Sequence, residues 1–372
     1  MKNKVVQLVA FKSVYNDYLQ ENLKKNPDFA GDFDLIDINI EDDMMEFENA
    51  KGFKRFKDIS NINRLIYFYY FNKYLILKYN YLKGSILHIQ SVSAKYAFLL
   101  CFFKKVFSKI IVTFWGSDLL RAEDNKKVLL RVISHFSNII TFETKAFSEL
   151  FKKQISNNYN SKIRIVDFGI QMLNDIDDVK CFDIASFKKQ YGICLESKVI
   201  AIGYSRIAEH QHVKVINSLI HSNVNKEGIF IVFPWTYGEE HRGYRDQIED
   251  SIKGKFDYVF IDNNLTNKDM AVLRCVTDIL VNVETTDVMS FSMLETLYAK
   301  NIVITGSWLP YDDIYNEGVY MARVDSVDEV GNKIKYLLNN SVDTRVVDQN
   351  KKIIGKLYRW DNCINKWIDL YK

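Results

Sequence analysis

The sequence has few of the residues that interrupt helices and strands. Only 3 of its 372 residues are Pro and 15 are Gly, which predicts short loops and abundant regular elements. Its five cysteines are odd in number and form no C-x-x-C pair. This pattern excludes an evident disulfide framework or structural zinc site and favours a reducing compartment.

Long apolar runs are also missing. The most apolar stretch, residues 96–103, ends at two lysines, whereas a membrane-spanning helix needs about 20 residues. The first residues run directly into a short apolar strand and lack the apolar core and cleavage site of a signal peptide. We therefore expect no spanning helix and a cytoplasmic protein.

What is present is an ordinary globular composition with an uneven charge. Apolar residues make up 48% and charged residues 26%, values that exclude a disordered or collagen-like chain. The net charge is only +3, yet residues 32–48 carry eight acids and no base, and residues 51–113 carry twelve bases and one acid. At about 150 residues per domain, the length predicts two domains, with three as the alternative.

Short apolar strands alternate with longer helical stretches, twice over. The expected strands are 4–9, 34–38, 85–89, 109–114, 138–142 and 163–166 in the first half, then 199–202, 229–233, 258–261, 279–283 and 302–305. Such alternation predicts parallel sheets, hence an α/β protein of two Rossmann-like domains facing across a cleft. We place the first domain at 1–175, a polar linker near 172–185, and the second domain at 186–345.

The last segment, 346–372, is expected to be a single helix that packs back on the first domain. Its apolar residues recur at spacings of 4, 3, 4, 3 and 4 and so share one face: Ile353, Leu357, Trp360, Ile364, Trp367 and Tyr371. A seam between two copies of the chain is the alternative.

The most informative segment runs from Thr286 to Glu295, after an expected strand and at the start of a helix. Ser290 or Ser292 can cap that helix, and its first amides can bind an anion. Glu295, one turn in, can accept hydrogen bonds from paired hydroxyls such as those of a ribose, and Asp287 precedes the helix. An acidic loop before a capped, packed helix is the plain alternative.

Asp287-x7-Glu295, followed by residues 298–304, resembles the acidic-x7-Glu signature of retaining glycosyltransferases of the GT-B fold, E-G-F-G-L-P-x-x-E-A-x-A-x-G-x-P-V-I. The resemblance, closest to glycosyltransferase family 4, implies the following roles. Glu295 binds the donor ribose, Asp287 contacts the donor sugar as a catalytic residue, and the diphosphate lies near the amides of Ser290, Phe291, Ser292 and Met293.

Three further segments resemble the same family. Residues 86–90 are similar to its strand I-I-H-x-H, with Gln90 at the second His, and residues 163–169 resemble the stretch that closes its first domain. Residues 110–118 resemble V-V-x-T-x-H-G-x-D, with Trp115 in place of the His. The implied acceptor side comprises Gln90, Trp115 and Gly116, and Asp118 is a catalytic candidate.

The segment 202–212 follows the first strand of the second domain. The family often has G-R-x-x-x-x-K-G there, with Arg and Lys on the donor diphosphate. Gly203 and Arg206 keep part of that pattern, and His210 or His212 can replace the Lys. The variant also resembles bacterial 4-acetamido-4,6-dideoxygalactose transferases. A capping turn with surface histidines is the alternative.

No metal or other cofactor is expected. Asp32-Phe33-Asp34 matches the D-x-D metal motif of a different transferase class, but it lies within an acidic run that we interpret as a solvated edge. The donor phosphates are assigned instead to the helix start and Arg206.

The basic segment 51–113 is also rich in Tyr and Phe, notably in 64–83 and 96–107. Aromatic residues beside Lys suit an anionic headgroup layer, so we expect peripheral binding at the inner face of the cell membrane. A buried aromatic helix with solvated lysines is the alternative. We find no nucleic-acid-reading motif.

Together these features predict a glycosyltransferase that moves a sugar from a nucleotide-sugar donor to a lipid-linked glycan or a surface-polysaccharide precursor, such as bacterial lipopolysaccharide or capsule. Retention of configuration is implied by the resemblance alone. The rivals are a nucleotide-sugar 2-epimerase of the same architecture and a non-catalytic subunit that binds sugar nucleotides.

Overall fold

The chain divides into two compact units. The computed structural model describes residues 2–9, 14–51, 61–90, 92, 95–120, 122–238, 240–263, 265–340 and 342–372. Unit 1 comprises Met1–Gly169 and Trp360–Lys372, and unit 2 comprises Ile170–Arg359. Part of the basic segment, Lys54, Arg55 and Lys57, lies outside the described residues.

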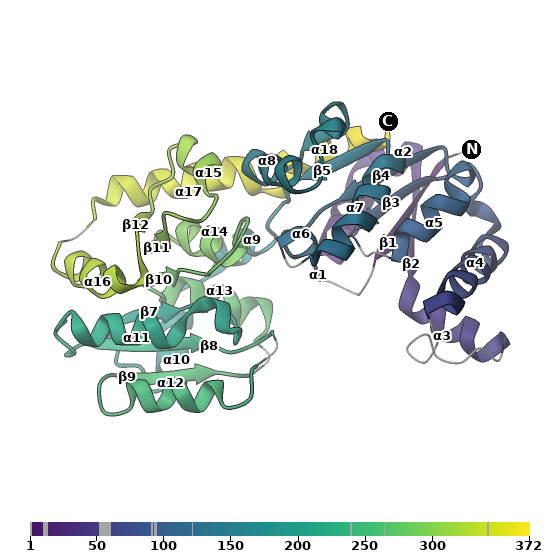
Figure 1. The fold of residues 1–372 in the computed structure, drawn as a ribbon. Helices are drawn as coiled ribbons and strands as arrows, with labels where there is room; N and C mark the ends of the chain where they lie inside the picture. The colour runs from purple at the N-terminus through teal and green to yellow at the C-terminus, as the bar shows by residue number, and fades with distance from the viewer. Residues whose placement is uncertain are drawn as a thin grey trace. The chain divides into compact units, whose positions relative to one another are not determined.

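Unit 1 is built on a parallel sheet in the order β2-β1-β3-β4-β5-β6 (Figure 1). Its strands are β1 (Asn3–Val9), β2 (Phe33–Asn39), β3 (Ile86–Gln90), β4 (Lys109–Thr113), β5 (Ile139–Phe142) and β6 (Ile163–Ile165). Its helices are α1 (Val14–Lys25), α2 (Pro27–Asp32), α3 (Ile40–Lys51), α4 (Asn61–Lys78), α5 (Lys95–Phe103), α6 (Ser117–Leu120), α7 (Asp124–Phe136), α8 (Lys145–Gln154) and α18 (Trp360–Tyr371).

Unit 2 repeats the parallel α/β plan with the strand order β12-β11-β10-β7-β8-β9. Its strands are β7 (Lys198–Ile202), β8 (Ile229–Pro234), β9 (Asp257–Ile261), β10 (Ile279–Asn282), β11 (Ile302–Gly306) and β12 (Ala322–Val324). Its helices are α9 (Met172–Asp178), α10 (Cys181–Gln190), α11 (His212–His221), α12 (Tyr244–Ile252), α13 (Asn267–Val276), α14 (Phe291–Tyr298), α15 (Asp312–Asn316), α16 (Val330–Asn339) and α17 (Thr344–Tyr358).

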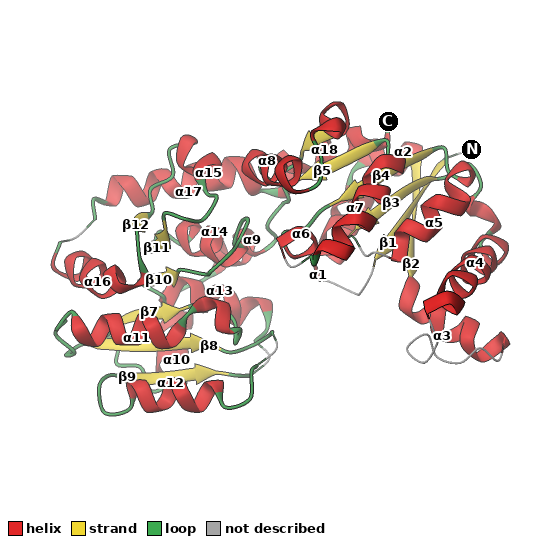
Figure 2. Ribbon diagram, viewed as in Figure 1, coloured by secondary structure: helices red, strands yellow, loops and turns green. Residues whose placement is uncertain are grey.

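Helices cover both faces of the unit 2 sheet (Figure 2). Along β7, Ile200 and Ile202 belong to a core shared with α11, α12 and α16, whereas Val199 and Ala201 belong to cores shared with α13 and α14. Successive side chains point to opposite faces of a strand, so a strand covered on both faces reads as an unbroken apolar run.

The expected α/β class is confirmed, and each expected strand is present within a residue or two of its predicted ends. The short strand β12, Ala322–Val324, was not predicted, because three residues carry almost no periodic signal. The predicted linker near 172–185 is instead largely helical: α9 and α10 occupy it, and the chain passes between units at Gly169 and Ile170.

The terminal segment forms two helices rather than one. Helix α17 ends at Tyr358, and Arg359 is extended, with φ −70° and ψ 139°. Helix α17 packs in unit 2, where Ile353 and Leu357 join an apolar core. Helix α18 packs in unit 1, where the indole of Trp360 lies against Gly169 so closely that a Cβ there would come within 2.3 Å of the ring.

Candidate functional site

The loops after β7 and β10 meet at the point where the strand order of unit 2 reverses. These two strands are hydrogen-bonded neighbours, with Ile279 opposite Ile200. The chain leaves β7 toward α11 on one face and leaves β10 toward α14 on the other. In open α/β sheets such a switch point, at the carboxyl ends of the strands, is where ligands bind.

Gly203 begins the loop after β7 with a φ of 66°, in the left-handed region. A Cβ at this position would lie 2.7 Å from the Cγ of His210 and 2.9 Å from the Nε2 of His212. Glycine is therefore required both by the backbone conformation and by the two imidazole rings.

Arg206 lies half-buried in the same loop. Its backbone amide donates to the Tyr237 carbonyl at 3.1 Å, and its Nη2 donates to the Thr236 carbonyl at 3.3 Å. Among the described residues, its Nε has no hydrogen-bond partner. A guanidinium with an unused donor suits an anionic group such as a phosphate.

The histidine His210 links the loops of β7 and β10. Its Nε2 lies 2.9 Å from the Ser205 hydroxyl, and its Nδ1 lies 3.4 Å from Glu284 Oε1. Its ring also packs edge-on against Tyr204, with centroids 4.3 Å apart. Sequence reasoning identified His210 but neither Ser205 nor Glu284.

His212 is the second histidine predicted to donate a hydrogen bond to the diphosphate, and its ring is packed among aromatic side chains. Its Nδ1 is 3.1 Å from the Tyr244 hydroxyl, and its ring packs against Trp235 and Phe233. Burial lowers the pKa of His212 to about 3, so the ring is neutral at pH 7. This environment favours a packing role.

Asp287 is fixed in position by its neighbours. It accepts a hydrogen bond from the Tyr311 hydroxyl, and its Oδ1 accepts from the Val288 amide at 2.7 Å. The Asn282 amide nitrogen donates to the Tyr311 oxygen at 3.0 Å. Burial, with Asp287 nearby, raises the pKa of Tyr311 well above its ordinary value, so its hydroxyl keeps its proton.

Helix α14 starts as the sequence predicts. Ser290 is its N-cap, and the Ser290 hydroxyl accepts from the Met293 amide at 3.2 Å. The Met293 amide is thus already bonded, which leaves the amides of Phe291 and Ser292 as the better candidates among those predicted to bind a diphosphate.

Glu295 lies within an ion pair. Arg274 on α13 donates from Nε to Glu295 Oε2 at 2.9 Å and from Nη2 to the Ser292 hydroxyl at 2.7 Å. Burial raises the pKa of Glu295, and the Arg274 charge opposes that shift. No pattern in the sequence pointed to Arg274, which lies 21 residues before Glu295. Ribose binding by Glu295 stays a prediction.

The predicted acceptor residues gather at the carboxyl edge of the unit 1 sheet. The Trp115 indole donates to Gln90 Oε1 at 3.1 Å, and Gln90 Nε2 lies 3.3 Å from His88 Nε2. His88 Nδ1 is 2.7 Å from the hydroxyl of Tyr371, on α18. Trp115 also packs edge-on against Phe168, with centroids 4.9 Å apart. Helix α18 thus supports the loop that contains Trp115.

Asp118 connects two loops of unit 1. Its Oδ2 accepts from the amides of Val92 and Trp115, both at 2.9 Å, and Gly116 lies half-buried between Trp115 and Asp118. Burial raises the pKa of Asp118 to about 7, although the two amides oppose the shift. These contacts give Asp118 a loop-anchoring role, and its catalytic role stays a prediction.

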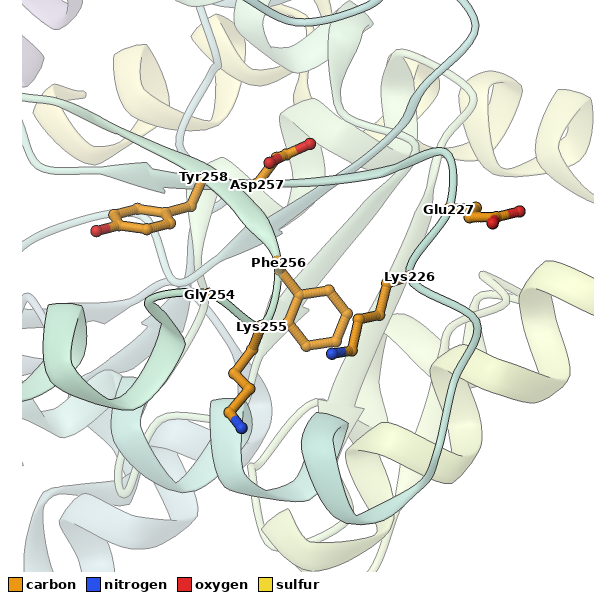
Figure 3. Close-up of a pocket in the computed structure, with 7 residues that line it drawn as sticks. All are labelled: Lys226, Glu227, Gly254, Lys255, Phe256, Asp257 and Tyr258. Carbon is orange, nitrogen blue, oxygen red and sulfur yellow. The ribbon is translucent and has the colours of Figure 1, made fainter.

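A surface hollow of about 540 Å³ lies at the opposite edge of the unit 2 sheet, beside the amino ends of β8 and β9. Figure 3 shows the residues that line it: Lys226, Glu227, Gly254, Lys255, Phe256, Asp257 and Tyr258. None of the predicted site residues lines this hollow.

No family model matches the sequence, and no curated protein matches it. Solved structures do match the fold. A glycosyltransferase from Rickettsia africae has a TM-score of 0.73 and 14% identity, over 100% of this chain and 98% of that chain. Anabaena HepE in complex with UDP and glucose has a TM-score of 0.72 and 11% identity, over 99% and 98%.

Sucrose-phosphate synthase from Thermosynechococcus elongatus is also similar, with a TM-score of 0.72 and 11% identity over 100% of this chain and 98% of that chain. Likeness at this level of identity defines the fold, the two-sheet α/β arrangement known as GT-B. Membership of family 4 and kinship with the acetamido-dideoxygalactose transferases stay predictions.

Proposed function

We propose that the protein is a glycosyltransferase that takes a sugar from a nucleotide-sugar donor bound at the switch point of unit 2. The observation that carries the proposal is that three groups lie at that edge: Arg206, whose Nε has no hydrogen-bond partner among the described residues, the start of α14 and the fixed carboxylate of Asp287. The GT-B fold supports it, since a protein of this fold has been crystallised with UDP and glucose.

In this proposal, each group acts on a different part of the donor. Arg206 and the first amides of α14 stabilise the charge that develops on the leaving diphosphate, which is where fixed donors lower a barrier most. Glu295 accepts from the ribose hydroxyls, and Asp287 accepts from the donor sugar. Because these groups supply the charge without a metal, we propose that the reaction is metal-independent.

For the acceptor, we propose a lipid-linked glycan or surface-polysaccharide precursor held by unit 1 near Gln90, Trp115 and Gly116. The half-buried indole of Trp115 stacks with the ring of Tyr15, with centroids 6.2 Å apart. The two rings provide aromatic surface of the kind that packs on sugar rings. Retention of the anomeric configuration belongs to the same proposal and rests on the resemblance of the Asp287–Glu295 segment.

We also propose that unit 1 binds the anionic inner face of a membrane. On α4, Ile66, Tyr70 and Leu77 are exposed at helical spacing, and Tyr69 contacts Phe102 of α5 with ring centroids 5.6 Å apart. We call this exposed set the aromatic face. Within the described residues, no helix is long and apolar enough to cross a bilayer.

Not every lysine of the basic segment 51–113 is available to an anionic membrane. Lys78 is paired with Asp43 at 2.8 Å and with Glu46 at 2.5 Å, both from the acidic helix α3. Lys73, Lys104 and Lys105 are exposed and form no ion pair with a described residue. These three, rather than Lys78, are therefore the cations proposed to meet anionic lipid.

The test incubates the full chain with a panel of nucleotide sugars, with and without a lipid-linked glycan extract. A transferase releases the nucleoside diphosphate and labels the lipid fraction. Conversion of the donor sugar to its 2-epimer without acceptor would identify the epimerase, and binding without turnover would identify the non-catalytic subunit; either result overturns the proposal.

A further inference from the structure

We propose that Ser205, His210 and Glu284 form a buried relay across the switch point, in which His210 is a positioning residue that carries a positive charge behind Arg206. The relay itself stands on the geometry of unit 2, and its role in holding a donor rests on the proposed function. We call these three residues the switch-point relay.

The three side chains come from both sides of the reversal in strand order. Ser205 follows β7, His210 ends the short 3-10 helix Ala208–His210, and Glu284 follows β10. The hydroxyl and the carboxylate lie 2.9 Å and 3.4 Å from the two ring nitrogens. All three residues are at most 2% exposed, so water does not screen these contacts.

The charge of Glu284 decides the state of His210. A buried carboxylate is costly unless a cation or a proton compensates it, and His210 Nδ1 stands at ion-pair distance. With Glu284 ionised, the imidazolium carries protons on both nitrogens. Its Nε2–H then donates to the Ser205 oxygen, and the Ser205 hydroxyl is free to donate in turn.

His212 provides a comparison inside the molecule. Its ring centroid is only 5.4 Å from that of His210, and both residues are buried. Yet its Nδ1 meets the neutral Tyr244 hydroxyl instead of a carboxylate, and burial lowers its pKa to about 3. Two adjacent buried histidines are therefore assigned opposite charge states.

Other charged and titratable groups lie near His210 on several elements. Tyr204 and His212 contact its ring, and Glu284 lies at its Nδ1. Arg206 and Glu209 belong to its own loop, and Tyr237, Asp287 and Tyr311 interact with the neighbouring Tyr204. Burial raises the pKa of Tyr204 and Tyr311 well above their ordinary values, so both remain neutral. Within the described residues, the Glu284 carboxylate is thus the anionic group found at ion-pair distance from the His210 ring.

The relay also supports the loop that contains Arg206. Ser205 precedes Arg206 directly, and the Glu209 carbonyl accepts from the Thr285 amide at 3.0 Å, which ties this loop to that of β10. The Trp308 indole donates to the Glu284 carbonyl at 2.8 Å. A positive charge fixed behind Arg206 strengthens the attraction for a diphosphate at the sheet edge.

The direct test is a histidine-ring NMR titration of the full chain labelled with ¹⁵N-histidine. Between about pH 6 and 8, the His210 ring is expected to stay protonated while His212 stays neutral. In Glu284→Gln, His210 should lose its proton at lower pH. A neutral His210 ring in the wild type at pH 6 overturns the relay, even where the variant does not fold.

The second arm measures the binding of UDP, GDP and dTDP by calorimetry. Glu284→Gln should weaken binding of the tightest of these nucleotides about tenfold, because the charge that Glu284 holds on His210 is lost. The loss of affinity should grow as the pH rises. Glu209→Gln removes one carboxylate from the same loop outside the relay and is the matched control. Equal effects of the two variants would overturn the positioning role.

The two arms separate this inference from the proposed function. If none of the three nucleotides binds while His210 is protonated in a manner that depends on Glu284, the relay stands and the donor assignment fails. If a nucleotide binds and the His210 signal is that of a neutral ring, the donor assignment stands and the relay fails.

Discussion

Arg274 and Glu295 are joined by an ion pair that is almost fully buried, with Nε and Oε2 2.9 Å apart. The pair joins α13 to α14, and the second arm of the guanidinium reaches Ser292. Glu295 therefore has two roles in our account: it neutralises Arg274, and it is proposed to accept from the donor ribose.

Substituting each partner separates these roles. Glu295→Gln should weaken donor binding about tenfold, because charge-assisted hydrogen bonds contribute roughly 1.5–3 kcal/mol, and should lower the free energy of unfolding by about 3 kcal/mol. Arg274→Gln breaks the same pair but keeps the carboxylate, so it should destabilise the fold with little effect on binding. Calorimetry measures the donor affinity and urea unfolding measures the stability of each variant. Equal losses of affinity in Glu295→Gln and Arg274→Gln would refute the ribose role.

Asp118 should make unit 1 sensitive to pH. Its pKa of about 7 lies above the ordinary value of 3.8, so between about pH 4 and 7 the folded state holds a proton that the unfolded state has released. Stability therefore falls as the pH rises through this window. Asp118→Asn keeps an oxygen for the Val92 and Trp115 amides, and its melting temperature should fall less than that of the wild type. Parallel melting curves against pH would contradict this account of Asp118.

Membrane binding should depend on Lys73, Lys104 and Lys105. The variant Lys73→Gln/Lys104→Gln/Lys105→Gln should release the protein from anionic vesicles, because each basic group near such a surface contributes about 1 kcal/mol. Lys78→Gln is the control, since Asp43 and Glu46 already neutralise that lysine. Wild-type binding should also weaken with salt, as the screening length falls from about 10 Å at 0.1 M to 3 Å at 1 M. If co-sedimentation is the same for all three proteins, the aromatic face has another role.

Metal chelation should leave turnover intact. The proposed diphosphate contacts are Arg206 and the start of α14, and they need no cation to bridge them. Activity with the best donor should therefore survive EDTA. Loss of turnover in EDTA with recovery on adding Mg²⁺ or Mn²⁺ would show that phosphate stabilisation has been assigned to the wrong groups.

The sequence predicted the strands well because strands covered on both faces are unbroken apolar runs, as in Val199–Ile202. It also reduced the cap of α14 to Ser290 or Ser292, and the structure has Ser290 in that position. The break at Arg359 was missed, because the apolar spacing continues through it from Leu357 to Trp360.

The site was predicted less completely, for a physical reason. Local patterns show which residues end a strand, but they do not show which side chains meet across neighbouring strands. Ser205 and His210 are only five residues apart, but Glu284 is distant in sequence and meets His210 only because β10 pairs with β7. Arg274 likewise meets Glu295 only because α13 packs beside α14. Glu284 did leave one signal, a charged residue directly after the strand segment 279–283, which is apolar except for Asn282.

The central claim is that unit 2 binds a nucleotide-sugar donor through Arg206. The most direct measurement is calorimetric titration of the full chain with a panel of nucleotide sugars and nucleoside diphosphates, compared between the wild type and Arg206→Gln. Our account predicts that at least one nucleotide binds and that the variant binds it at least about tenfold more weakly, the loss of one charge-assisted contact. No binding by any member of the panel, or equal binding by the variant, would contradict it.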